Sequence, residues 1–175
     1  TFRKLDFTLE PGVTINEAVT RPLLQAGLAG AMVEIEGGAL GPFTYVLPAA
    51  SPDRDHAAFY SRSYRIDGLS VLHRAGVSVG WRDDAPFIHC HGVWTEPDGS
   101  RHAGHMIPSE TIIAAPVRAS AWGSTDTIFM AEPDPETNFT LFRPAECAVG
   151  PLETGASGVL ARIRPNEDVC EAIEA

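Results

Sequence analysis

The stretch that decides the fold runs from Phe87 to His105 and reads FIHCHGVWTEPDGSRHAGH. Near its middle, Pro97-Asp98-Gly99 combines a proline of fixed φ, an aspartate that favours turns and a glycine suited to the left-handed position of a three-residue loop. We therefore predict a β-hairpin in which Glu96 and Ser100 flank the loop.

The register that this loop sets brings three histidines together. His91 is predicted to lie opposite His105, at a Cβ separation of about 4.5–5.5 Å. His89 shares their face because alternate side chains of a strand project to the same side. Cys90 and His102 project to the opposite face, so His102 is left out of the site. A β-bulge would shift the register and remove this assignment.

Three neutral imidazoles form a donor set that suits zinc better than the harder cations. Three protein ligands leave the fourth tetrahedral position open to water or a substrate. Nickel, iron and copper are alternatives to zinc. A further alternative is that the three histidines are polar residues of an exposed strand and bind no metal.

The whole chain has the composition of one soluble globular domain. It has 175 residues, of which 44% are hydrophobic and 21% charged, which is enough for a sizeable core. No apolar run approaches the roughly 20 residues that span a bilayer, and the N-terminal segment lacks the apolar region of a secretion signal. The three cysteines are widely spaced and predict no disulfide framework. We therefore expect a cytoplasmic protein.

The charge of the chain argues against nucleic acid as a partner. Thirteen basic residues stand against 23 acidic ones, for a net charge of −10, and nucleic-acid binding derives most of its affinity from Lys and Arg that neutralise phosphates. Lys4 is the single lysine. The arginines between Arg54 and Arg82 alternate with aspartates, so we interpret them as a solvated surface.

Few helices and many strands predict an α+β fold with a mainly antiparallel sheet and one or two packed helices. Thr14 and Glu17 form a capping box ahead of a predicted helix over residues 15–26. The apolar segment 111–121 is predicted to be a long strand that crosses the middle of the sheet.

The last part of the chain resembles its beginning. Residues 163–173, IRPNEDVCEAI, repeat the pattern of residues 9–19, LEPGVTINEAV: a strand end, a proline, a helix N-cap and a helix start. Asp168 takes the place of Thr14 and keeps the capping chemistry. We therefore expect a metal-binding domain over residues 1–150 and the start of a second, truncated copy over residues 156–175. The alternative is that such strand–proline–helix starts are simply common.

Several of these motifs resemble those of the plants-and-prokaryotes-conserved (PPC) domain family, in particular its bacterial metal-binding branch. The resemblance covers residues 9–123 and rests on LEPG at residues 9–12, YRIDGLS at residues 64–70 and the hairpin. Its most specific part is His89-Cys-His91, followed by Asp98-Gly99 and then Ala103-Gly-His105. The family has two glycines before the last histidine, so Ala103 is a departure that leaves the ligand in place.

This resemblance implies an α+β domain that assembles as a homotrimer and a metal held by His89, His91 and His105. Plant members of the family combine the domain with AT-hooks and act on DNA, and many bacterial relatives carry a DNA-binding label. This chain contains no Arg-Gly-Arg-Pro hook, and it keeps the histidines that plant members generally lack. The resemblance therefore gives little support for a role of this chain in DNA binding.

The sequence is consistent with three functions, and it does not decide whether the chain is an enzyme. The first is a zinc-binding protein whose open coordination position binds a small anionic or carbonyl ligand, with hydrolase or lyase activity as an extension. Glu110 and Glu96 are the nearest carboxylates in sequence for a general base, and Glu34 is a more distant candidate. The second is a DNA-binding or regulatory protein. The third is a structural metal in an interaction scaffold, which a closed fourth coordination position would favour.

Overall fold

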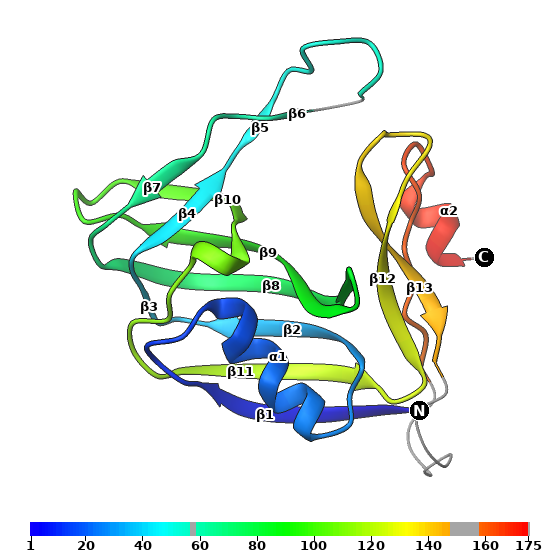
Figure 1. Cartoon of the computed structure of the whole chain (residues 1–175), viewed down its shortest axis with the longest axis horizontal. Helices are drawn as coiled ribbons and strands as arrows, with labels where there is room; N and C mark the ends of the chain where they lie inside the picture. Colours follow the sequence, from blue (N-terminus) through cyan, green and yellow to red (C-terminus); the bar gives the residue numbers. More distant parts are fainter. Residues whose placement is uncertain (57–58, 148–157, 175) are drawn as a thin grey trace.

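The computed structural model describes residues 1–56, 59–147 and 158–174, and its strands form mainly one antiparallel sheet (Figure 1). The main path of the sheet runs β1-β11-β2-β8-β9-β10-β4-β7; β3 and β12 pair with β8, and β13 pairs with β12. Strands β5 and β6 form a separate two-stranded ribbon. The strands are β1 (Phe2–Leu9), β2 (Gly30–Glu36), β3 (Ala39–Leu40), β4 (Phe43–Val46), β5 (Pro48–Ala49), β6 (Phe59–Tyr60), β7 (Tyr64–Ile66), β8 (Ser70–Arg82), β9 (Ala85–Thr95), β10 (Arg101–Met106), β11 (Val117–Ser124), β12 (Thr127–Pro133) and β13 (Thr140–Glu146).

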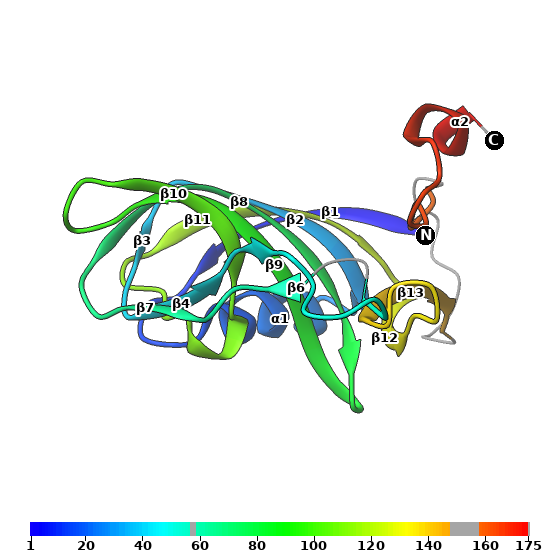
Figure 2. The same cartoon turned by 90° about the horizontal axis from the view of Figure 1, so that it is seen from above.

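Helix α1 (Ile15–Gln25) covers one face of this curved sheet (Figure 2). It begins where the capping box predicts, because Thr14 Oγ1 accepts a hydrogen bond from the backbone N–H of Glu17 at 3.2 Å. The helix buries Ile15, Val19 and Leu23 completely in the core that it shares with the sheet. Full burial of each such side chain contributes about 1.5–3 kcal/mol to the free energy of folding, so the face of the sheet under α1 holds the core.

The fold contains more β-structure than the predicted α+β class. Among the residues that the structure describes, only α1 packs on the sheet, since the second α-helix, α2 (Val169–Glu174), has no buried residue. A short 3-10 turn, η1 (Pro108–Glu110), precedes β11. The fold is therefore a mainly antiparallel β-sheet with one packed helix. Within the described ranges, no helix has the length and apolar character needed to cross a membrane.

The longest strand pair, β8 with β9, lies in the middle of the sheet, and the prediction that residues 111–121 cross it is wrong. Strand β11 begins only at Val117 and lies between β1 and β2, next to an edge. Residues 111–116 instead make isolated bridges, Thr14 with Ile112 and Leu40 with Ile113. Pro116 explains why the strand begins only at Val117, because proline has no backbone N–H to donate to a neighbouring strand and restricts the backbone of the residue before it.

Strand β12 packs closely against the end of β8. The two strands run parallel at one pair, Met130 with Trp81. A Cβ atom on Gly80 would lie 2.2 Å from the backbone oxygen of Phe129, so only glycine allows this approach. The β12–β13 hairpin therefore stands as a wall at one end of the β8–β9 pair, which Figure 1 shows beside the sheet.

The predicted second copy is represented by the described residues 158–174. Asp168 Oδ1 accepts the N–H groups of Cys170 and Glu171 at 2.9 and 3.1 Å, so it caps α2 as Thr14 caps α1. None of the described residues 158–168 is in a strand, and residues 156, 157 and 175 lie outside the described residues. The capping chemistry at Asp168 is confirmed, while the assignment of residues 156–175 to a second domain stays a prediction.

Candidate metal centre

The β9–β10 hairpin has the predicted loop and register. The N–H of Gly99 donates to Glu96 O at 2.9 Å, and Gly99 has the left-handed φ of 87° that its place in the loop requires. The N–H of Glu96 donates to Ser100 O at 2.8 Å and closes the loop. His91 pairs directly with His105 in this register. The turn residues alone were therefore sufficient to predict which histidines face one another.

His89, His91 and His105, which we call the histidine triad, converge on the face of the sheet that points away from α1. One ligand atom from each ring lies within 4.8 Å of the others. His105 Nδ1 is 3.3 Å from His91 Nε2. Tetrahedral zinc with Zn–N bonds of roughly 2.0–2.1 Å holds its nitrogen ligands about 3.3 Å apart. His91 and His105 therefore already have the spacing of two zinc ligands, and His89 would supply the third.

The surroundings of the triad favour neutral imidazoles. Burial against the protein, together with the neighbouring histidines, lowers the pKa of His89 to about 4, and the same causes lower the pKa of His105 to about 4. Burial also lowers the pKa of His91. Among the described residues, no acidic group joins this cluster, so a positive charge on an imidazole would have no counter-charge there. Free nitrogen lone pairs at neutral pH are what a metal ligand needs.

No family model matches the sequence, and no curated protein matches it. Several solved structures are similar to this chain. A metal-containing protein from Archaeoglobus fulgidus is 15% identical over 81% of this chain and 93% of its own, with a TM-score of 0.64. A plant- and prokaryote-conserved (PPC) protein from Pyrococcus horikoshii is 15% identical over 81% of this chain and 91% of its own, with a TM-score of 0.62.

This chain has a PPC-like fold. A third similar structure comes from Bacteroides thetaiotaomicron and bears a provisional description as a DNA-binding protein; it is 13% identical over 82% of this chain and 96% of its own, with a TM-score of 0.58. At these identities the likeness concerns the fold. The candidate metal site of this PPC-like chain rests on its own histidines.

The two carboxylates considered first as a general base, Glu96 and Glu110, both lie on the other side of the PPC-like sheet. Glu96 Oε1 accepts hydrogen bonds from Tyr45 Oη at 3.0 Å and Trp94 Nε1 at 3.4 Å, on the buried face of the hairpin. Glu110 belongs to η1, whose next residue, Thr111, accepts the N–H of Ile15 in α1 through its backbone oxygen. The structure therefore brings neither Glu96 nor Glu110 to the triad.

Glu34 is placed more favourably, through a row of residues that crosses three strands. Glu34 on β2 pairs with Gly76 on β8, and Gly76 pairs with His91 on β9. The Cα atoms of Glu34 and His91 are thus two strand spacings apart, about 9–10 Å. Gly76 has no side chain, and a Cβ there would meet nothing within 4 Å. Glu34 can extend across this open position toward the triad.

The buried face of the hairpin explains why the remaining residues of the motif are not ligands. Cys90 is fully buried, and burial raises the pKa of its thiol to about 12. Trp94 and Met106 are fully buried beside it. His102 pairs with Trp94, as predicted, and its Nε2 lies 3.0 Å from Ser100 Oγ. The hairpin therefore divides into a core face that holds it and an outer face that carries the triad.

A cavity of about 470 Å³ adjoins the triad and was not predicted from the sequence. His89 lines it from β9, and Tyr60 lines it from β6. The ring centroid of Tyr60 lies 5.9 Å from that of His105. The opposite wall comes from β12, β13 and residues 161–165. Only the tertiary packing of these distant segments creates the space, so no local sequence pattern signals it.

Proposed function

We propose that this chain is a zinc-binding, PPC-like protein that holds the ion with His89, His91 and His105 and binds a small ligand at the open fourth position. The observation that carries this proposal is the convergence of three neutral imidazoles beside a cavity. Another divalent transition metal is the alternative for the ion, because imidazole also suits nickel, iron and copper.

Hydrolase or lyase chemistry is an extension of this proposal. A bound zinc ion supplies a Lewis acid that polarises an oxygen atom of the ligand. We assign proton transfer to the carboxylate of Glu34, which lies in the same row of paired residues as Gly76 and His91. Glu96 and Glu110 lie on the opposite face of the sheet. Glu34 is exposed on the same face of the sheet as the triad.

A structural role for the metal has less support from the packing. The hairpin is already held by its backbone ladder and by the buried side chains of Cys90, Trp94 and Met106. The triad lies on the outer face, and no fourth acidic or cysteine ligand joins it among the described residues. A site with three ligands on a preformed scaffold is the arrangement of catalytic or ligand-binding zinc rather than of structural zinc.

DNA binding is the second candidate, and it follows from the descriptions of two structural neighbours. The charge of this chain opposes it, because 13 basic residues face 23 acidic ones. The outer face of the sheet also mixes both signs: Glu36 lies between Arg118 and Arg74 in one row of paired residues.

Assembly as a homotrimer belongs to the same proposal. Met32 and Trp122 pair across β2 and β11 on the outer face and are 45% and 54% exposed. Such large apolar side chains are suited to contact between subunits. Light scattering after gel filtration measures the mass directly, and a mass of one chain would contradict this part of the proposal.

The decisive experiment is metal analysis of the purified protein by inductively coupled plasma mass spectrometry. We expect about one zinc ion per chain in the wild type and none in the double variant His89→Ala/His105→Ala. The matched control is His102→Ala, which removes a histidine from the other face of the same hairpin and should retain the metal. Wild-type protein that takes up no transition metal, even after incubation with zinc, would refute the proposal.

A further inference from the structure

We propose that the cavity beside the triad binds an organic carboxylate with an apolar body, and that Arg82 and Arg164 recognise its carboxylate group. The inference deepens the proposed function by naming the class of ligand, and it rests on that function only for the contact with the metal.

The lining of the cavity combines apolar surface with positive charge. Phe87, Phe129 and Phe142 contribute aromatic rings, which are packed together: the centroid of Phe142 is 6.2 Å from that of Phe87 and 5.8 Å from that of Phe129. Among the described residues that line the cavity, three are arginines and none is acidic. Aspartate and glutamate outnumber basic residues in the whole chain, 23 to 13, so this local excess of positive charge selects for an anion.

The cavity volume of about 470 Å³ corresponds to a small organic molecule, because such pockets measure roughly 300–1,000 Å³. An inorganic anion alone would leave the aromatic surface in contact with water. A wholly apolar molecule would leave the arginines without a partner. A carboxylate with an aromatic or aliphatic body satisfies both parts of the lining.

The strand register places the anion-binding end away from the metal-binding end. His89 pairs with Ser78, and Arg82 lies four positions further along β8 on the same face. Four positions correspond to about 13 Å along a strand. Phe87 pairs with Gly80 and lies on this face between the two. A ligand whose carboxylate meets Arg82 therefore extends its apolar body over Phe87 toward His89.

Arg82 is positioned for this contact by its neighbours. Its guanidinium carbon lies 5.3 Å from the centroid of the Phe87 ring, which orients the group along the lining. Its ion pair with Asp83, at 3.6 Å, involves two side chains that are at least half exposed. Exposed pairs of this kind contribute little energy, so Arg82 remains available to a ligand.

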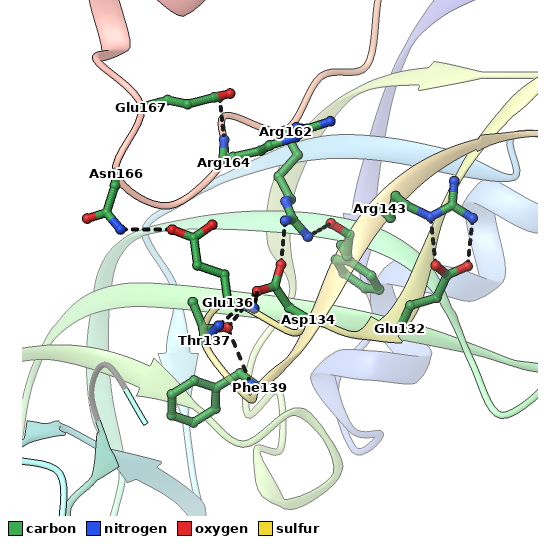
Figure 3. A network of polar contacts seen from close by, with 11 residues as sticks. Glu132, Asp134, Glu136, Thr137, Phe139, Arg143, Arg162, Arg164, Asn166 and Glu167 are labelled. Atoms are coloured by element: carbon green, nitrogen blue, oxygen red, sulfur yellow. Dashed lines mark hydrogen bonds and ion pairs between the residues drawn. The ribbon is translucent and has the colours of Figure 1, made fainter. Parts of the chain in front are cut away.

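The far wall of the cavity is fixed by a polar network that Figure 3 shows. Arg162 Nη2 donates to Asp134 Oδ2 at 2.6 Å, and Asp134 Oδ1 also accepts the N–H of Thr137 at 3.0 Å. Asn166 Nδ2 donates to Glu136 Oε1 at 2.8 Å. These bonds attach residues 162–166 to the loop between β12 and β13. The charge of Arg162 is matched by Asp134, so Arg162 holds the wall and does not bind the ligand.

Arg164 follows Arg162 by two residues and also lines the cavity. Its backbone N–H donates to Glu167 Oε2 at 2.9 Å, which fixes the main chain at this point. In the part of the chain that the structure describes, no carboxylate forms an ion pair with the Arg164 guanidinium. Arg164 thus supplies an unmatched positive charge from the wall, while Arg82 supplies one from the sheet.

The test uses 3-phenylpropionate as the probe and compares it with 3-phenylpropanol and 3-phenylpropylamine, which keep the apolar body and change the charged end. Calorimetric titrations are carried out on the full chain, once loaded with zinc and once after removal of metal by a chelator. We expect the acid to bind both forms and to bind more tightly than the alcohol or the amine. Arg82→Gln and Arg164→Gln should each weaken binding of the acid by about tenfold. Arg65→Gln, an exposed arginine paired with Asp67 outside the cavity, is the matched control and should not change it.

The other outcomes separate this inference from the proposed function. Equal binding of the acid and the alcohol, or no binding of either, would refute the carboxylate pocket. Binding of the acid only to zinc-loaded protein, unaffected by both arginine variants, would place the carboxylate on the metal; the proposed function would then stand and the pocket would not. Arginine-dependent binding in a protein that never takes up zinc would support the pocket and remove the proposed function.

Discussion

Two glycines of β8 that lie on the same face should respond in opposite ways to substitution by alanine. At Gly80, the new Cβ would lie 2.2 Å from the backbone oxygen of Phe129 and 2.7 Å from its Cβ. Backbone atoms cannot rotate away, so β12 must move, and overpacking of this kind costs about 1–3 kcal/mol. At Gly76, the new Cβ would meet nothing within 4 Å. Alanine there should stabilise the strand by about 0.5–1 kcal/mol, because glycine loses more backbone entropy on folding.

The two effects together predict that Gly76→Ala is more stable than Gly80→Ala by about 1.5–4 kcal/mol. Urea unfolding followed by circular dichroism measures the difference, and similar slopes for the two variants would show that both unfold from compact native states. The displacement of β12 should also weaken binding of 3-phenylpropionate in Gly80→Ala, because Phe129 lines the cavity. Equal stability of the two variants would contradict the packing of β12 on β8, and with it the wall of the proposed pocket.

Further predictions concern the metal, pH, catalysis and DNA. Free zinc at 100 times its dissociation constant should raise the free energy of unfolding by about 2.7 kcal/mol, and the melting temperature by roughly 5–11 °C for a chain of this size; His89→Ala/His105→Ala should show no shift in a thermal scan. Folding lowers the pKa values of His89 and His105 from 6.5 to about 4, so between pH 4 and pH 6.5 the unfolded chain binds more protons than the folded one. The free energy of unfolding of the metal-free protein, measured by urea titration, should therefore decrease as the pH falls from 6.5 to 4. The decrease should be smaller in His89→Ala/His105→Ala. Glu34→Gln should slow hydrolysis of p-nitrophenyl acetate by zinc-loaded protein by about 100-fold, whereas Glu36→Gln, on the same face of β2, should not; equal rates would exclude Glu34 as the base. Fluorescence anisotropy with duplex DNA should show no binding at 150 mM salt, and tight binding would restore the DNA-binding alternative.

The triad could be predicted from the sequence because its geometry is local. One turn with a glycine in the left-handed conformation fixes the hairpin register, and alternation along two strands then decides which side chains share a face. The same alternation would have excluded Glu96, which has the parity of Trp94 and accepts a hydrogen bond from it on the buried face. Glu96 was selected by distance along the sequence, and that is a poorer guide in a strand than parity.

Glu34 and the cavity depend on pairings between segments far apart in the sequence. The row from Glu34 over Gly76 to His91 requires the registers of β2 with β8 and of β8 with β9. The second register follows from the two-residue turn Asp83-Asp84, whose residues both have a left-handed φ. The first joins strands that no short turn connects. Residues 161–165 are held at the cavity by contacts with distant residues, such as the bond from Arg162 to Asp134, 28 positions earlier. The sequence pattern of this segment instead pointed to its likeness with residues 9–19.

The division of the β9–β10 hairpin into two faces accounts for how one short motif serves both folding and ligand binding. Residues of one parity, including Cys90 and Trp94, are fully buried and hold the strands without help from an ion. Residues of the other parity, His89 and His91, therefore contribute little to the core, and their replacement should leave the sheet intact. A metal site built in this way can lose its ion without unfolding, so the coordination sphere is free to exchange water for a ligand. The adjoining cavity, with aromatic rings near the triad and arginines at its far end, then determines which ligand arrives there.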